Sequence, residues 1–234
     1  MTMTQISSPI HALAQMLLHP TAVMKQVKAV RYWSWIPFLL QLVVTVGVST
    51  LYFYSVDWSW YQQQFVLPSL SNLAPAEIEM ALEFSKPSTF VISSAMTGLL
   101  FTPAIVAALA FYLSKMTQMD EDNIQGFTDW YGLCWWMQLP LVISALIGVG
   151  MIVAGSERID PLLVLAPLSL ANLASIGADS AWYNLASSVS LLGLWVMVLQ
   201  YKGVRAWTKL GPLMTLLIVL LPYAVCYGIW LSLI

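Results

Sequence analysis

Charged residues are scarce in this chain of 234 residues. Lys and Arg together number nine and Asp and Glu eleven, so 9% of the residues are charged and 59% are hydrophobic. A soluble domain carries about 25% charged residues, because its surface must face water. The scarcity excludes a soluble enzyme and a disordered chain, and the net charge of −2 argues against binding to nucleic acid. An integral membrane protein remains.

Residues that carry chemistry are equally few. Cys134 and Cys226 provide no disulfide framework, and His11 and His19 have no partner at the spacing of metal ligands. The acidic residues at 120–122 lack the glycine and the regular spacing of a calcium loop. The chain shows neither a glycine-rich phosphate loop nor a nucleophile with a base. We therefore predict no catalytic, cofactor-binding or metal-binding residue, and no enzymatic activity.

Long apolar runs, by contrast, are abundant. Five stretches are long enough to cross the roughly 30 Å hydrocarbon core as helices, and none contains Lys, Arg, Asp or Glu. A β-barrel would instead show alternating residues over about ten positions. The sequence thus predicts an all-α integral membrane protein, a bundle of five transmembrane helices at about 33–56, 89–113, 132–154, 183–201 and 211–233.

The distribution of the cations predicts the orientation of these helices, since short cytoplasmic loops are enriched in Lys and Arg. With five spans, seven of the nine cations lie on the side of the N-terminus, and Lys86 and Arg158 lie on the other side. If the apolar segment 161–178 also crossed, the last basic loop would lie on the outer side. Four cations would then lie on the cytoplasmic side and five on the outer side. We therefore predict a cytoplasmic N-terminus and a periplasmic C-terminus. Segment 161–178 should be interfacial or re-entrant, buried against the bundle.

The tryptophans agree with this topology. Trp and Tyr prefer the two membrane interfaces, where both the apolar ring and the polar N–H or O–H find suitable surroundings. Ten of the eleven tryptophans fall near a predicted boundary, and Trp195 alone lies well inside a span. Those assigned to the inner boundary are Trp33, Trp35, Trp130, Trp135, Trp136 and Trp207.

Basic residues flank the spans on the predicted cytoplasmic side. Residues 1–32 form an amphipathic segment that precedes the membrane domain of residues 33–234, and Pro20 interrupts its helix. This segment either lies in the interface or only orients the first span. Six cations are candidate contacts for anionic phospholipid of the bilayer: Lys25, Lys28, Arg31, Lys202, Arg205 and Lys209.

Small residues four positions apart let helices approach closely in a membrane. Such stripes occur in the second, third and fifth spans, which we therefore expect to form the tight centre of the bundle. Pro103 and Pro222 fall in mid-span, where each removes a backbone donor and favours a kink. The candidate packing residues are Ser94, Gly98, Thr102, Ser144, Gly148, Ala224, Gly228 and Ser232.

Several stretches, taken in order, make the chain resemble one known family. They are LLHPTAVMKQV (17–27), LAPAEIEMALEFSKP (73–87), DNIQGFTDWYGLCWWMQLP (122–140), DPLLVLAPLSLANL (160–173), ADSAWYNLA (178–186) and KGVRAW (202–207). Together they resemble the bacterial branch of the Ypt/Rab-interacting protein (YIP) family. The resemblance implies a polytopic helical protein with a cytoplasmic N-terminus, here in a bacterial inner membrane, and it implies no catalytic residues.

Two functions are compatible with a membrane domain that lacks buried charge. The first is a non-enzymatic adaptor or organiser of protein partners or lipids, which would engage another membrane protein or form a homo-oligomer. The alternative is a channel or carrier for a small neutral or lipidic solute. That alternative requires Gln41, Gln138 and Gln200 to face one continuous cavity, and a filled bundle centre would exclude it.

Overall fold

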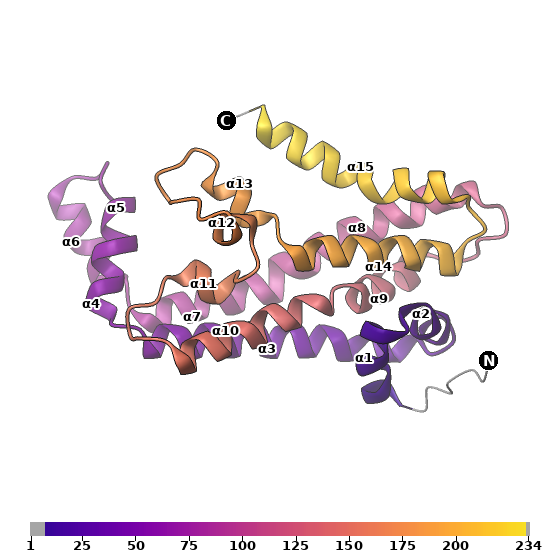
Figure 1. The fold of residues 1–234 in the computed structure, drawn as a ribbon, viewed down its shortest axis with the longest axis horizontal. Coiled ribbons are helices and arrows are strands. Elements are labelled where there is room, and N and C mark those ends of the chain that lie inside the picture. The colour runs from indigo at the N-terminus through magenta and orange to yellow at the C-terminus, as the bar shows by residue number, and fades with distance from the viewer. Residues whose placement is uncertain (1–7, 233–234) are drawn as a thin grey trace.

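The computed structural model describes residues 8–232, and it is built mainly from helices (Figure 1). Strand-like pairing within these residues is limited to one isolated bridge between Ser169 and Ser190. The predicted all-α class is therefore confirmed. The α-helices are α1 (Pro9–Leu18), α2 (Pro20–Ala29), α3 (Trp35–Ser55), α4 (Trp58–Tyr61), α5 (Leu67–Ser69), α6 (Pro75–Phe84), α7 (Pro87–Met96), α8 (Thr102–Met116), α9 (Phe127–Met137), α10 (Pro140–Ala154), α11 (Pro161–Leu165), α12 (Leu170–Leu173), α13 (Tyr183–Ser188), α14 (Leu191–Trp207) and α15 (Pro212–Leu231). Between them lie the 3-10 turns η1 (Arg31–Ser34) and η4 (Thr117–Met119) and the π-helical segments η2 (Gln62–Val66) and η3 (Thr97–Phe101).

Long helical segments run along the long axis of the molecule, and each is roughly antiparallel to the one before it in the chain (Figure 1). They are α3, the continuous segment α7–η3–α8, the segment α9–α10, α14 and α15. Four of them are, by length and composition, able to cross a membrane: Tyr32–Ser55, Pro87–Met119, Phe127–Ala154 and Pro212–Leu231. These correspond to the first, second, third and fifth predicted spans, and they confirm the prediction of a multi-pass helical protein.

The fourth predicted span differs from the prediction, because residues 183–201 do not form one helix. Between α13 and α14, Val189 is extended, and the Ser190 side chain accepts a hydrogen bond of 3.0 Å from the Gly193 N–H. A Ser side chain favours this break because it caps a new helix start more readily than it continues an old helix. With 17 residues α14 is about 25 Å long, and its last turns include Lys202.

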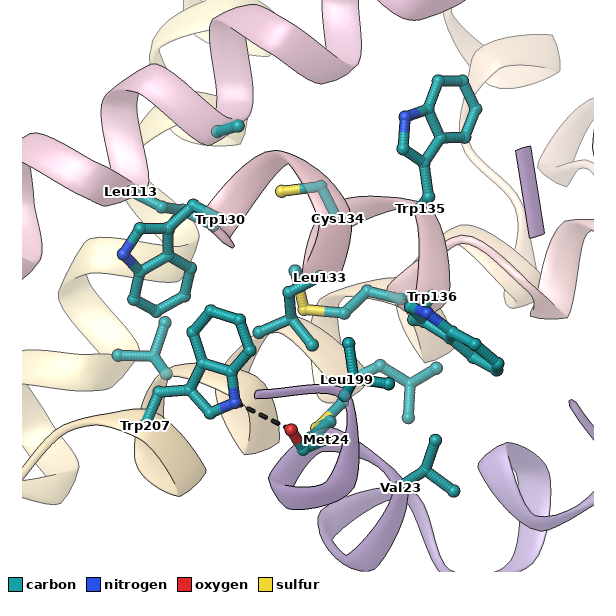
Figure 2. Packing of buried hydrophobic residues seen from close by; sticks show 14 of the residues in the cluster. Val23, Met24, Leu113, Trp130, Leu133, Cys134, Trp135, Trp136, Leu199 and Trp207 are labelled. Atoms are coloured by element: carbon teal, nitrogen blue, oxygen red, sulfur yellow. Dashed lines mark hydrogen bonds between the residues drawn. The ribbon is translucent and has the colours of Figure 1, made fainter. Parts of the chain in front are cut away.

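The main hydrophobic core lies at the end of the molecule where the N-terminal helices meet the α8–α9 and α14–α15 connections (Figure 1). There α2 packs against α9 and α14, and the side chains of Val23 and Met24 are fully buried. The Trp207 indole N–H donates a hydrogen bond of 2.8 Å to the Met24 carbonyl, and its ring lies 5.1 Å from that of Trp130 (Figure 2). These contacts attach the N-terminal helices to the long helices.

Five of the six tryptophans assigned to the inner membrane interface lie in this core. Trp33, Trp130, Trp135, Trp136 and Trp207 are at most 7% exposed, whereas Trp35 is 66% exposed. The indole N–H groups of Trp130 and Trp136 have no hydrogen-bond partner in the described part of the chain. Leaving them unpaired costs free energy, which burial of the large rings must outweigh. These five indoles are thus surrounded by protein, and their position at the inner membrane boundary stays a prediction.

Segment 161–178 is buried against the bundle, as predicted. α11 packs against α10 and α3, and Val164 is fully buried beside Gly148. Gly148 lies six residues before the end of α10, so α11 contacts this helix about 9 Å from its end. The Asn172 side-chain amide donates to two backbone carbonyls of the same segment, at 3.0 and 2.9 Å. Those bonds satisfy polar groups that an apolar setting would otherwise leave unpaired.

The centre of the bundle is α3, which packs against both α7 and α10, while α15 contacts mainly α14. The expectation that the second, third and fifth spans form the centre is therefore wrong. Two of the expected small residues nevertheless permit close approach to other segments. Gly98 faces Leu42 of α3, and Gly148 faces the backbone of Val164 in α11.

Mid-span prolines alter the backbone of two helices. Pro222 of α15 leaves the carbonyl of Ile218 without its usual helical donor, and the Tyr112 hydroxyl of α8 donates to that oxygen at 2.8 Å. In the second span, the residues before Pro103 form the π-helical η3. At Pro103 the α-helical backbone thus changes to a π-turn. At Pro222 the missing backbone hydrogen bond is replaced by one from a neighbouring helix.

A helical projection formed by α4, η2, α5 and α6 extends from the opposite end of the molecule (Figure 1). At its base, Arg158 forms a salt bridge of 3.0 Å with Asp57. Hydrogen bonds from the Ser59 hydroxyl, from the Trp60 backbone N–H and from Arg158 lower the pKa of Asp57 to about 2. These contacts connect the projection to the loop after α10.

Candidate functional site

A cavity of about 460 Å³ lies between α3, α7, α10 and the returning chain that follows α10. None of the residues in its lining is charged, and the polar ones carry hydroxyl or amide groups. The lining consists of Gln41, Val44, Thr45, Val48, Ser49, Ser93, Ser94, Thr97, Leu141, Val142, Ser144, Ala145, Val164, Leu165, Ala166, Ser187 and Ser190.

The polar side of the cavity is ordered by helix geometry. Gln41, Thr45 and Ser49 are spaced four residues apart, so they share one face of α3. Ser94 of α7 and Ser144 of α10 line the same cavity from the neighbouring helices. Within the described residues, the side chains of these five form no hydrogen bond with the protein. Their donors and acceptors are therefore available to a bound molecule.

The glutamines test the requirement for one continuous cavity. Gln41 lines it, but Gln138 does not, and Gln200 is 2% exposed and donates to the Tyr223 hydroxyl at 2.7 Å. Two of the three glutamines lie outside the cavity, so the requirement is not met. The cavity is partly open to the outside of the protein, because Thr45, Ser93 and Thr97 in its lining are exposed. Its volume lies within the range of about 300–1,000 Å³ that is typical of ligand sites.

A second hollow, of about 470 Å³, lies near the end where α2 meets α3 and α9, and we call it the aromatic groove. Five of its thirteen lining residues are aromatic, and its polar residues include Lys28 and Asp129. The Phe38 and Trp135 rings meet edge to face with 4.8 Å between their centroids. The groove is lined by Val27, Lys28, Ser34, Trp35, Phe38, Leu99, Pro103, Thr128, Asp129, Tyr131, Gly132, Trp135 and Trp207.

The candidate lipid contacts gather near this same end of the molecule. The exposed ones are Lys25, Lys28, Lys202, Arg205 and Lys209, while the side chain of Arg31 lies outside the described residues. Lys209 forms an ion pair with Asp122, which raises the pKa of Lys209 and lowers that of Asp122. Arg205 donates to the Leu210 carbonyl. Contact with phospholipid stays a prediction for all six.

The candidate packing residues occupy different surroundings. In the second and third spans, Ser94 and Ser144 line the cavity, Gly98 and Gly148 face α3 and α11, and the Thr102 hydroxyl donates to the Thr97 carbonyl at 3.4 Å. In the fifth span, Ala224 is exposed, and a Cβ at Gly228 would meet no atom within 4 Å. The Ser232 hydroxyl donates to the Ile229 carbonyl of its own helix. The stripe in α15 is thus not covered by another helix.

Sequence reasoning missed the fourth wall of the cavity. Ala166, Ser187 and Ser190 belong to a stretch that the prediction divided between an interfacial or re-entrant segment and a continuous span. The spacing of Gln41, Thr45 and Ser49 was the available signal, because three polar residues on one face of an apolar helix need polar surroundings.

A family model described as the Yip1 domain matches residues 14–233. No curated protein and no solved structure matches the chain. The match begins within α1 and extends past α15, so it includes the N-terminal helices, the cavity and the aromatic groove. The resemblance to the YIP family is thereby confirmed. Matched over nearly its whole length, and carrying four helices able to cross a membrane, the chain is a multi-pass membrane protein that belongs to the Yip1 domain family.

Proposed function

We propose that this protein is a non-enzymatic organiser of lipids, which binds an uncharged, hydroxyl-bearing amphiphile in the cavity between α3, α7 and α10. The observation that carries the proposal is a lining that combines free hydroxyl and amide groups with no charged residue. Such groups can bind and orient a polar molecule. The lining supplies no acid, base or metal ligand, and for this reason we propose binding rather than catalysis.

The chemistry of the lining selects the class of ligand. Sugar and polyol hydroxyls both donate and accept hydrogen bonds, as Ser and Thr hydroxyls do. A phosphate group would lose its water here without a cation to replace it, at a cost of several kcal/mol. Val44, Val48 and Val142 offer apolar contact to the part of the ligand next to its headgroup. A neutral glycolipid therefore fits this cavity better than an anionic phospholipid.

Lipid binding is tested by native mass spectrometry of the purified protein. The protein is titrated with monoglucosyl dioleoylglycerol and, separately, with dioleoylphosphatidylglycerol, and we expect the glucosyl lipid to bind at the lower concentration. In the double variant Gln41→Leu/Thr45→Val the cavity loses two hydrogen-bonding groups at nearly constant volume. Its binding should weaken about thirtyfold, since each of the two hydrogen bonds contributes about 1 kcal/mol.

Thr50→Val is the matched control on the same helix. The Thr50 hydroxyl donates to the Val46 carbonyl at 2.7 Å and is not part of the lining. Its loss should leave the titration with the glucosyl lipid unchanged. Equal affinity for the two lipids, or an equal effect of Thr45→Val and Thr50→Val, would refute the assignment of the ligand.

The membrane topology is a further part of the proposal. We infer five crossings of a bacterial inner membrane, with α14 as the fourth, the N-terminus in the cytoplasm and the C-terminus in the periplasm. The inference is supported by the cations, of which seven of nine then face the cytoplasm, and by the common end shared by α1, α2 and the α14–α15 connection (Figure 1). Alkaline phosphatase fused to the C-terminus should be active, because it folds only in the periplasm. An inactive fusion would contradict an odd number of crossings.

A further inference from the structure

The cavity and the aromatic groove are separated by a third, much smaller hollow, which we call the constriction. It measures about 30 Å³. It shares Gln41 and Thr45 with the cavity, and it shares Phe38 and Trp135 with the groove. The three hollows thus follow one another along α3, from Ser49 at one end to Trp35 at the other. That stretch of helix is about 21 Å long, which is most of the roughly 30 Å hydrocarbon core.

The constriction has a volume that suits water rather than a lipid headgroup. At Gly98 the second span approaches α3 closely, because a Cβ there would lie 3.1 Å from the Cδ1 atom of Leu42. On the groove side, Phe38 and Trp135 meet edge to face. The Trp135 ring points away from Leu133 (Figure 2), and it lines the constriction. Two large spaces therefore meet at a point that a few side chains close.

The backbone beside the constriction is the least regular part of the second span. Residues 97–101 are π-helical, and Pro103, which supplies no N–H, follows directly. The one side-chain bond across this turn, from Thr102 to the Thr97 carbonyl, is long at 3.4 Å. Helices bend at π-turns and prolines, so α7 and α8 can change their mutual angle here more easily than elsewhere in the span.

We propose that η3 is the hinge of a gate, and that the protein transfers its neutral amphiphile along α3 between the two halves of the membrane. This inference rests on the proposed ligand class. Bending at η3 moves Gly98 away from Leu42 and joins the three hollows into one path. A headgroup on that path exchanges hydrogen bonds with Ser49, Thr45 and Gln41 in turn, and it meets no charge before the groove. The path passes Gln41 but neither Gln138 nor Gln200, so it differs from the single cavity that the sequence-based carrier hypothesis requires.

The transfer is tested in vesicles that contain the purified protein and a monoglucosyl lipid with an NBD label on its acyl chain. Dithionite bleaches the label in the outer leaflet, and the label in the inner leaflet is lost only if the lipid is transferred. Gly98→Leu fills the constriction and should slow the transfer about tenfold or more. Its binding of the unlabelled glucosyl lipid should match that of the wild type, because Gly98 is not among the residues that line the cavity.

Gly47→Leu is the matched control, since a Cβ at this position of α3 would meet no atom within 4 Å. It should transfer at the wild-type rate. Phe38→Ala widens the constriction and should accelerate the transfer, which keeps the test decisive if Gly98→Leu does not fold. Transfer by Gly98→Leu at the wild-type rate, slower transfer by Phe38→Ala, or binding without transfer in the wild type would overturn the gate alone. Absence of binding in the wild type would overturn the proposed function as well.

Discussion

Replacing Gly148 with Ala should push α11 away from α10 and so damage one wall of the cavity. A Cβ at position 148 would overlap the carbonyl oxygen of Val164 and lie 3.2 Å from its carbonyl carbon. These are backbone atoms, which cannot rotate aside as the end of a flexible side chain can, and α11 must therefore move as a unit. Overpacking of this kind costs about 1–3 kcal/mol. Since Val164 is fully buried, the movement also exposes apolar surface.

Gly150 provides the matched control in the same helix. It lies two residues further along α10, and a Cβ there would meet no atom within 4 Å. A helical Gly→Ala substitution without a clash gains up to about 1 kcal/mol, because Ala loses less conformational entropy. We therefore expect effects of opposite sign, with Gly148→Ala less stable than the wild type and Gly150→Ala as stable or more stable.

Thermal unfolding in detergent micelles, followed by tryptophan fluorescence, measures this difference. For a chain of this length each kcal/mol shifts Tm by about 2–4 °C, so a loss of 2 kcal/mol lowers it by about 4–8 °C. Gly148→Ala should also weaken binding of the glucosyl lipid, because α11 lines the cavity. Equal unfolding temperatures for the two variants would refute the close approach of α11 to α10.

Two further predictions concern single hydrogen-bonding groups. Tyr112→Phe leaves the Ile218 carbonyl unpaired and should cost about 1–3 kcal/mol, but less in a Pro222→Ala background, where the helix supplies a donor of its own. Thermal unfolding of the single and double variants measures this coupling, and an equal cost in both backgrounds would contradict the role given to the tyrosine. The pKa of Asp57 is lowered to about 2, so its charge stabilises the fold at neutral pH, and that contribution disappears as the pH falls from about 4 to about 2. Asp57→Asn should therefore unfold at a lower temperature than the wild type at pH 7 and at the same temperature near pH 2, whereas a pH-independent difference would speak against the ion pair with Arg158.

The spans were predictable where their signal is local. The lack of charge and the length of each apolar run show α3 and α15 directly, since both are properties of neighbouring residues. The break at Val189 and Ser190 was not predictable in this way, because the apolar character of the chain continues across it. What creates the break is a Ser cap together with a hydrogen bond of 2.7 Å from Leu170 to the Val189 carbonyl, and that partner is remote in the sequence.

The tryptophans show a different limit. An indole suits both a membrane interface and a protein core, so residue type alone does not distinguish these surroundings. Trp130 and Trp136 are buried because α9 is surrounded by α2, α8 and α14, elements that come from three separate parts of the chain. The cavity depends on distant parts in the same way. The spacing of Gln41 and Ser49 predicts a shared polar face, but the space opposite that face is created by α7, α10 and the chain that follows α10.

The hydrogen bond from Trp207 to the Met24 carbonyl joins residues that are 183 positions apart. Because synthesis proceeds from the N-terminus, α2 is complete long before its binding surface on α14 exists. Until then α2 can contact α1 and α9, but the surface that α14 provides for it is missing. Docking of α2 therefore marks a chain whose synthesis has passed α14. A product that stops earlier keeps its N-terminal helices undocked, where proteases that remove incomplete membrane proteins can reach them.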